Sequence, residues 1–361
     1  MVGWLVLSVL TAGLIVGCGL AISNDSGGGA AVDTSTQSLT SDCRVIEHDL
    51  GETEVCGQPQ KVVTLSLHTL DLLLSLDTQP VGCTMTLDVY RGEVFDKPAQ
   101  QIPYLGDRLT TQPVNLGNDH APSLEKLAML KPDLILGEAS RNADEYSLLS
   151  QIAPTILWRN RTAKGQWRES LRAIAAALGR DQKAEAVIQQ YEAQIADARA
   201  DLADVVAAHP TLLLLGINRL DEGVLATSPD SYLGELLAGV GFQLIPLPSA
   251  NINSNALISI EALPELDDAD TVIILGWNFD VSDGTLGNPD PSTNQSASDW
   301  FETHQMKTIK QDWEANAIAQ SLTASQENRV YFATFYKWNG LNGPIGAELI
   351  LEQLYQFLLN P

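Results

Sequence analysis

The chain has 361 residues, 45% of them hydrophobic, which is enough to form two ordinary globular cores. Its 45 Asp and Glu residues outnumber its 21 Lys and Arg residues, and the formal net charge is −24. A nucleic-acid-binding protein needs a basic face, so this charge argues against a nucleic-acid partner. We expect an acidic, well-solvated surface.

The N-terminal stretch MVGWLVLSVLTAGLIVGCGLAIS carries no charged side chain. It is typical of an export signal, and we predict a signal peptide over residues 1–17. A retained transmembrane helix is the alternative, because an apolar stretch of about 18 residues can span a bilayer. Residues 18–41 are rich in Gly, Ser, Thr and Ala, which predicts a flexible tether. Either interpretation places the body of the protein outside the cytoplasm.

Two of the four cysteines, Cys43 and Cys56, flank the stretch RVIEHDLGETEV. This stretch predicts two strands around a turn, a hairpin that brings the two cysteines opposite each other. In an oxidising compartment a disulfide is expected there, with two free thiols as the alternative. Cys83 follows an apolar run and is expected to be a small buried residue.

The body begins with alternating strand and helix patterns. KVVTL predicts a buried strand, HTLDLLLSLD a helix and PVG the start of the next strand, and QIPYLG and DLILG are further short apolar runs that end in Gly. Strands that alternate with helices predict a parallel sheet covered on both faces.

Helical patterns follow APTILW. GQWRESLRAIAAALG predicts one helix, Gly179 ends it, and a longer helix is predicted from Asp181 to about Ala208, before Pro210. At about 1.5 Å per residue the longer helix spans roughly 40 Å, enough to connect two lobes. A coiled coil is the weaker alternative. The apolar residues of its narrow stripe are Ala184, Ile188, Tyr191, Ile195, Ala198, Leu202 and Val205.

The alternation then resumes. Strands are predicted at TLLLLGI, QLIPL, TVIILG and RVYFAT, and helices at SYLGELLAGVGF, SIEAL and GAELILEQLYQFLL, while NFDVSDGTLGNPDPSTNQSASD predicts a surface loop. The pattern therefore indicates two α/β lobes. The predicted boundaries are residues 42–165 for the N-terminal lobe, 166–208 for the connecting helices and 209–361 for the C-terminal lobe.

The order of several motifs resembles the periplasmic binding proteins of ferric-siderophore and cobalamin ABC importers. These motifs are GET, PQKVVTLS, PVG, SLEKLAMLKPDLILG, APTI, the long helix, SIEALPELDDADTVIILG and WNGLNGPIGAELILEQL. The resemblance covers about residues 43–361. It implies two Rossmann-like lobes with parallel sheets, joined by a single long rigid α-helix, and a ligand cleft between the lobes.

The stretch LIVGC resembles the lipobox of bacterial lipoproteins, in which the cysteine, here Cys18, is acylated and becomes the first mature residue. This resemblance implies a periplasmic protein anchored to the outer face of the cytoplasmic membrane by an N-terminal lipid. The sequence departs from the pattern in one respect, because no Lys or Arg precedes the apolar run.

Two glutamates occupy the same place in two similar motifs, Glu125 in SLE and Glu261 in SIE. In the resembled family, a glutamate on the outer face of each lobe contacts arginines of the membrane permease, and paired contacts of this kind fix a docking geometry. The alternative is that each carboxylate favours the positive end of a helix. Both interpretations can hold together.

Ligands of parallel α/β sheets bind beyond the carboxyl ends of the strands. The residues predicted to bind the ligand by this rule are Ser66, His68, Arg108, Arg141, Arg219, Trp277, Tyr336 and Trp338. Arginine grips anionic oxygens and aromatic rings supply apolar walls, which suits a ferric chelate. The alternatives are surface ion pairs for the arginines, core packing for Trp338 and a hydrogen-bonded or solvent-facing side chain for His68.

We predict the solute-binding component of an iron(III)-siderophore ABC importer, which works as a monomer with a permease and a separate ATPase. Iron arrives in the chelate, so no covalent cofactor and no direct protein–metal ligand are expected. An enzyme is not expected, since G-x-S-x-G, G-x-x-x-x-G-K-[ST] and H-E-x-x-H are all absent. The alternatives are a cobalamin-, haem- or metal-binding protein of the same fold, which a cleft containing both His68 and His120 would favour, and a periplasmic α/β enzyme.

Overall fold

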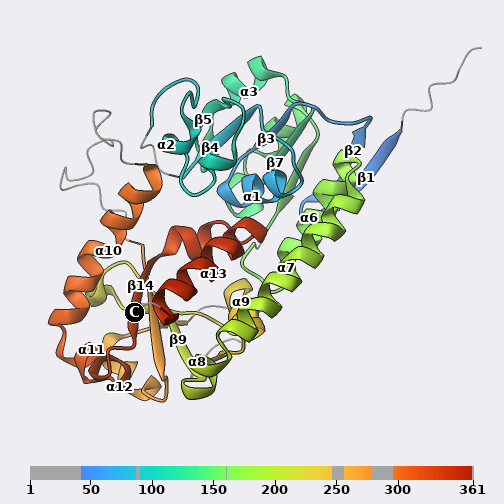
Figure 1. The fold of residues 1–361 in the computed structure, drawn as a ribbon. Coiled ribbons are helices and arrows are strands. Elements are labelled where there is room, and N and C mark those ends of the chain that lie inside the picture. Colours follow the sequence, from blue (N-terminus) through green and yellow to red (C-terminus); the bar gives the residue numbers. More distant parts are fainter. Residues whose placement is uncertain (1–41, 87–89, 160, 246–255, 278–295, 360–361) are drawn as a thin grey trace, which may run out of the picture. The chain divides into compact units, whose positions relative to one another are not determined.

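The computed structural model of the chain describes residues 42–86, 90–159, 161–245, 256–277 and 296–359 (Figure 1). The predicted signal peptide, the tether and the lipidation site Cys18 lie outside the described residues. Residues 41–361 form one compact unit. The predicted boundaries near residues 165 and 208 stay predictions. Within the described part of the chain, no helix is long and apolar enough to cross a membrane.

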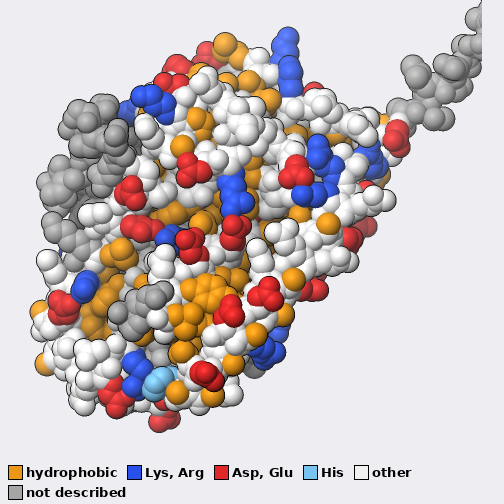
Figure 2. All heavy atoms as spheres, in the orientation of Figure 1, with side chains coloured by type: hydrophobic (Ala, Val, Ile, Leu, Met, Phe, Trp, Pro, Cys, Tyr) orange, Lys and Arg blue, Asp and Glu red, His pale blue; other side chains and the backbone are white. Residues whose placement is uncertain are grey.

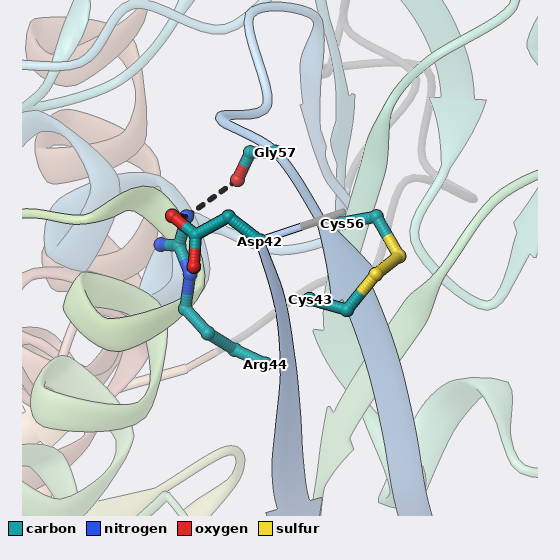
Figure 3. Close-up of a disulfide and its surroundings, with 5 residues drawn as sticks. All are labelled: Asp42, Cys43, Arg44, Cys56 and Gly57. Carbon is teal, nitrogen blue, oxygen red and sulfur yellow. Dashed lines mark hydrogen bonds and ion pairs between the residues drawn. A yellow bond between two sulfur atoms is a disulfide. The ribbon is translucent and has the colours of Figure 1, made fainter. Parts of the chain in front are cut away.

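The body starts with the predicted hairpin. Strands β1 (Cys43–His48) and β2 (Gly51–Cys56) pair antiparallel, with Cys43 opposite Cys56. A disulfide joins these two cysteines, as expected (Figure 3). Arg44 donates hydrogen bonds to the carbonyl oxygens of Gly57 (2.5 Å) and Ala176 (2.8 Å). The hairpin is therefore tied to helix α6 (Gln166–Leu178).

The first sheet has the strand order β6-β5-β4-β3-β7-β8, and its strands are parallel except for β6. The strands are β3 (Val62–Thr64), β4 (Gly82–Met85), β5 (Val114–Asn118), β6 (Ala121–Pro122), β7 (Leu134–Glu138) and β8 (Thr155–Trp158). The helices between them are α1 (Leu67–Ser75), α2 (Pro98–Gln101), the 3₁₀ helix η1 (Gly106–Arg108), α3 (Leu124–Leu130), α4 (Ala139–Asn142) and α5 (Tyr146–Ile152). Cys83 lies buried in β4 with a free thiol, as expected.

The prediction of a strand at QIPYLG is wrong. Pro103 has no N–H to donate to a strand ladder, and the N–H of Gly106 bonds to the carbonyl of Ile102, as in a helical turn. The segment joins α2 to η1, and β5 takes the place beside β4 in the sheet. Arg108 therefore follows no strand.

The second sheet has the order β12-β10-β9-β13-β14, with β11 also paired to β9. Strands β9, β11, β13 and β14 are parallel, and β10 and β12 are added antiparallel. The strands are β9 (Thr211–Ile217), β10 (Val224–Ala226), β11 (Gln243–Leu244), β12 (Ala256–Ile258), β13 (Thr271–Gly276) and β14 (Val330–Thr334). The α/β class built on parallel strands is thus confirmed for both sheets.

The helices of this half include one that the sequence reading missed. The surface loop predicted at 278–299 lies mostly outside the described residues, but its end belongs to helix α10 (Ala297–Ala315). A capping box formed by Ser296 and Asp299 begins this helix. The other helical elements are η2 (Leu220–Glu222), α9 (Tyr232–Val240), η3 (Ile260–Leu266), α11 (Ala317–Ser321), α12 (Thr323–Gln326), the π-helical turn η4 (Tyr336–Gly340) and α13 (Pro344–Leu359).

Three helices connect the first sheet to the second along the chain. Helix α6 ends at Gly179, whose φ of 66° favours glycine, and α7 (Asp181–Asp201) follows it along one side of the sheets (Figure 1). The expected continuous helix to Ala208 is interrupted at Leu202, beyond which α8 (Ala203–Ala208) begins. Most of the predicted apolar stripe is buried: Ala184, Ile188, Tyr191, Ala198 and Leu202.

The last helix, α13, packs against α1 and α7 (Figure 1). Asp71 on α1 is fully buried and accepts hydrogen bonds from the backbone N–H groups of Ile345 (3.1 Å) and Gly346 (2.8 Å). Its carboxyl group therefore caps the first turn of α13. The Nδ1 atom of His68, one turn earlier on α1, donates to the carbonyl of Leu341 (2.6 Å). Helix α1 thus holds the start of α13 at two points.

We expect Asp71 to make stability depend on pH. Burial raises the pKa of Asp71 to about 7, although hydrogen bonds from Gly346 and Ile345 lower it. The folded protein then keeps this proton to a higher pH than the unfolded chain does, so stability falls as the pH rises from about 4 to about 7. The loss from this one group is at most about 4 kcal/mol.

Urea unfolding of the wild type and Asp71→Asn at several pH values from about 4 to about 8 measures this effect. The variant should lose this part of the pH dependence, whatever its stability at a single pH. Asp77→Asn, which changes an exposed carboxylate paired with Lys183, is the matched control and should follow the wild type. Equal slopes in the wild type and Asp71→Asn would contradict the assignment.

Candidate functional site

A cavity of about 340 Å³ lies at the carboxyl ends of strands from both sheets. The loops after β3, β4, β5, β7 and β8 form one part of its wall, and the segment after β14 forms the other. Its lining residues are Ser66, Leu67, Thr86, Asp119, His120, Glu138, Arg141, Arg161, Phe335, Tyr336 and Gly340. This is where ligands of parallel α/β sheets are expected to bind.

Local hydrogen bonds fix the polar side chains of the first part of this wall. The Ser66 hydroxyl caps α1 by accepting a hydrogen bond from the N–H of Thr69 (3.2 Å). The Thr86 hydroxyl donates to Asp119 (2.6 Å). Hydrogen bonds within the protein thus hold both hydroxyl groups, so their positions do not depend on a ligand.

Glu138, at the end of β7, and Arg161, after β8, form a buried ion pair at 2.5 Å. Arg161 also donates to the Asn342 side chain (3.2 Å) and to the carbonyl of Asn339 (3.2 Å). Burial raises the pKa of Glu138, but the positive charges of Arg161 and Arg141 and the hydrogen bond from Arg161 outweigh it and hold the pKa at about 2. The guanidinium group of Arg161 therefore binds Glu138 of the first sheet and, at the same time, the segment before α13. The Glu138 carboxylate stays ionised, which strengthens this contact.

Arg141, on α4, is paired with a second buried carboxylate. Its guanidinium lies 2.9 Å from Asp119 and 2.7 Å from the Nε2 atom of the exposed His120, which accepts from it. The Nε atom of Arg141 and the Oδ1 atom of Asp119 are buried and have no hydrogen-bond partner among the described residues. This pair therefore has one donor and one acceptor left for a ligand.

His68 lies next to the cavity but does not line it. Its side chain is fully buried, and burial lowers the pKa of this histidine to about 4, so the ring is neutral at physiological pH. Because a carbonyl can only accept, Nδ1 carries the hydrogen bonded to Leu341. The hydrogen-bonded alternative fits this placement. Of the two histidines that together would favour haem or a bare metal, only His120 reaches the cavity.

No metal-binding cluster is present in the cavity as far as the structure describes it. Within the described ranges, the group of His, Cys, Asp and Glu side chains close enough to share a metal ion is Cys43, Glu54 and Cys56. The two cysteines of that group are joined in the disulfide, so their sulfur atoms are not available as thiolate ligands.

Three of the predicted ligand-binding residues, Ser66, Arg141 and Tyr336, line the cavity. Trp277 lies behind it, edge-on to Phe335 with ring centroids 4.9 Å apart. Trp338 does not reach the cavity, because its side chain is fully buried in the core and its indole N–H donates to Gln353 (2.8 Å).

The other two predicted arginines lie in separate hollows. Arg108 lines a hollow of about 450 Å³ beside α1, α7 and α13 and pairs with Glu348 at 2.8 Å. Figure 2 shows acidic and basic side chains next to each other over α1 and α13. Arg219 lines a hollow of about 920 Å³ and pairs with Asp221 at 2.9 Å. Both arginines have the surface ion pairs that were the alternative interpretation.

The larger hollow is formed by η2, β12, η3 and α10, all from the second half of the chain. Its charged residues lie on the surface, whereas the cavity of 340 Å³ contains buried charges that converge from several strands. Perturbed buried charges at strand ends are typical of ligand sites. We therefore take the smaller cavity as the candidate site.

Three polar residues of the cavity, Thr86, Asp119 and Arg161, were not predicted from the sequence, and His120 was named only for the haem or metal alternative. Strand β5, with the sequence VNLGN, was not recognised because Asn and Gly occupy three of its five positions. Recognising it would have placed Asp119 and His120 at a strand end. Arg161 lies three residues beyond β8, and the arginines after APTILW were not considered.

The model of the family described as "Periplasmic binding protein" matches residues 62–336. The chain belongs to this family of extracytoplasmic binding proteins. It is 28% identical over 358 residues, 97% of this chain and 96% of the relative, to the Fe(3+)-citrate-binding protein YfmC of Bacillus subtilis. It is 26% identical over 320 residues, 86% of each chain, to the putative ABC transporter substrate-binding lipoprotein YhfQ of the same organism.

The fold is also similar to solved structures. The structure of Staphylococcus aureus SirA complexed with staphyloferrin B matches with a TM-score of 0.64 and 24% identity, and the match covers 88% of this chain and 98% of SirA. At this identity the similarity establishes the fold. The similarity in structure confirms the α/β fold class, and the family model confirms the family resemblance seen in the sequence.

We expect Arg161→Lys to destabilise the protein by about 2 kcal/mol, because lysine cannot reproduce the three-way contact with Glu138, Asn339 and Asn342. Chemical denaturation measures the change. Arg172→Lys, which alters an exposed pair with Glu185, is the matched control and should change stability little. Equal stabilities for Arg161→Lys and the wild type would show that the buried contacts do not need the guanidinium.

Proposed function

We propose that this protein is the solute-binding component of an ABC importer, and that it captures an iron(III)-siderophore chelate and delivers it to a membrane permease. Membership of the periplasmic binding protein family and the similarity to YfmC support the proposal. The observation that carries it is the cavity, in which Arg141 offers a buried donor beside the rings of Phe335 and Tyr336. Guanidinium donors and aromatic walls suit the oxygen-rich surface of a ferric chelate.

In this proposal the iron is part of the ligand, and the binding component performs no chemical step. The similarity to YfmC, which is named an Fe(3+)-citrate-binding protein, supports a complete chelate as the ligand. Cobalamin and haem are the alternative ligands for the same fold. The proposed organisation keeps the two lobes at residues 42–165 and 209–361, with connecting helices at 166–208.

The proposed location is the outer face of the cytoplasmic membrane. Cys18 would carry the lipid, and residues 18–41 would serve as the tether, after removal of residues 1–17. The similarity to YhfQ, which is named a lipoprotein, supports this part of the proposal. The binding component would act as a monomer, together with a permease and a separate ATPase.

We expect ferric siderophores to bind in the cavity and to quench the fluorescence of the nearby aromatic side chains. Arg141→Ala should weaken binding at least about tenfold, because it removes a guanidinium group that lines the cavity. Arg219→Ala, which changes a paired arginine in a different hollow, is the matched control and should bind normally. A response to cobalamin or haem, with none to any ferric chelate, would replace the proposed ligand and leave the fold unchanged.

Both proposed docking glutamates are exposed in the first turn of a helix. Glu125 lies in α3 and Glu261 in η3, and neither has a hydrogen bond or an ion pair within the described part of the chain. An exposed apolar side chain lies four residues from each: Met129 is 75% exposed, and Leu257, which lines the same hollow as Glu261, is 71% exposed. Exposed apolar groups beside unpaired carboxylates are typical of a surface that contacts a partner.

We expect the double variant Glu125→Ala/Glu261→Ala to bind the chelate with unchanged affinity and to lose iron uptake in cells, since the carboxylates lie outside the cavity and contact only the permease. Uptake of the radiolabelled ferric chelate measures the effect. The matched control is Glu169→Ala/Glu352→Ala, which removes two exposed carboxylates from α6 and α13. Normal uptake by the docking variant would refute the assignment.

A further inference from the structure

The charges in the cavity balance one another. Four charged side chains line it, the carboxylates of Asp119 and Glu138 and the guanidinium groups of Arg141 and Arg161. Arg141 lies 2.9 Å from Asp119, and Arg161 lies 2.5 Å from Glu138. The exposed His120 uses its ring nitrogen to accept from Arg141. The cavity therefore presents buried ions of both signs and no excess of positive charge.

The two carboxylates are built into the wall. Asp119 is 1% exposed, accepts a hydrogen bond from Thr86 and forms an ion pair with Arg141. Glu138 is 2% exposed, and the charge of Arg161 keeps it ionised at any physiological pH. Both carboxylates are buried and held by these contacts, so neither can turn its charge toward solvent. Their negative charges therefore remain beside a ligand in the cavity.

Among the residues that line the cavity, the cations are Arg141 and Arg161. The internal stretches outside the described residues are 87–89, 160, 246–255 and 278–295, and their sequences contain no Lys and no Arg. The last of them contains three aspartates, Asp280, Asp283 and Asp290. Lys337, close after Tyr336, is paired with Glu302. The positive charges in the lining of the cavity are thus those of its two arginines, and each is paired with a carboxylate.

Asp119 adds a specific requirement. Its Oδ1 atom is buried at the cavity and has no hydrogen-bond partner among the described residues. An unsatisfied buried carboxylate oxygen is costly unless a donor reaches it. A ligand with an N–H or ammonium group near this atom would satisfy it, whereas an anionic oxygen would be repelled.

We propose that the cavity selects neutral or cationic ferric chelates that bring an N–H donor to Asp119, such as hydroxamate siderophores, and discriminates against strongly anionic chelates. This inference rests on the proposed function and adds the charge class of the ligand. A trianionic chelate would face two fixed carboxylates whose counter-ions are already paired. A neutral chelate avoids this repulsion and keeps the donor of Arg141 for its iron-bound oxygens.

Titration of the full-length protein with four ferric chelates tests the inference. The probes are the iron(III) complexes of desferrioxamine B (cationic), ferrichrome (neutral), citrate (anionic) and enterobactin (trianionic). We expect the first two to bind at least about tenfold more tightly than the last two. Tighter binding of ferric citrate or ferric enterobactin would overturn the inference and leave the proposed function standing. Failure of all four to bind would overturn both.

The salt dependence of the same titrations gives a second readout that needs no variant. Binding of the anionic ferric citrate to a cavity with balanced charges should not weaken by more than about threefold between roughly 0.01 M and 1 M NaCl, because no net positive field attracts this ligand. An affinity for ferric citrate that falls steeply with salt would show an unbalanced positive field in the cavity and would overturn the inference.

Asp119→Asn keeps the shape of the side chain and removes its charge. We expect it to improve the binding of ferric enterobactin about tenfold and to weaken that of the cationic desferrioxamine B complex by a similar factor. Glu185→Gln, which removes one charge from the exposed pair between Arg172 on α6 and Glu185 on α7, is the matched control and should leave the order of affinities unchanged. An unchanged order in Asp119→Asn would contradict the role of this carboxylate. If this variant does not fold, the titrations of the wild type decide.

Discussion

The contact between α1 and the start of α13 is the constraint on which the rest of the structure depends. A buried carboxyl group, that of Asp71, caps the first turn of α13, and His68 holds the carbonyl of Leu341 just before it. Apolar side chains from both helices surround these bonds, among them Leu70, Leu74 and Ile345. The polar contacts give the junction its direction, and the apolar contacts exclude water from it.

This junction also positions the candidate site. The segment that α1 holds begins at Leu341, directly after the turn η4 that carries Tyr336, so the wall after β14 is fixed against the loops of the first sheet. Arg161 adds a second connection to Asn339 and Asn342 in the same segment. The buried ions of the cavity thus serve two purposes, because they bind the two sheets together and set the electric field that the ligand meets.

Much of the fold could be predicted from local patterns. Continuous apolar runs such as TVIILG predicted central strands correctly, and the glycine at 179 correctly predicted a helix end. The failures have local reasons. QIPYLG is apolar but contains a proline that cannot join a sheet, VNLGN is a strand without the usual residues, and α10 carries few apolar residues in a clear period.

The candidate site could be predicted only in part. The rule that ligands lie beyond strand ends found Ser66, Arg141 and Tyr336, because their strands were recognised. The same rule counted His68 and Trp338 as ligand-binding, since position along the chain does not show which way a side chain points. Both side chains lie in the interior, where each has a hydrogen-bond partner.

The sequence by itself determined the α/β class, the hairpin with its paired cysteines and the family, because these depend on residue order and local periodicity. Only the tertiary structure decided which charges meet. Asp119 and Arg141 are 22 residues apart, and Glu138 and Arg161 are 23 apart, in segments that share no local pattern. Their pairing, and with it the balanced charge of the cavity, arises because parallel strands distant in sequence end at the same edge of a sheet.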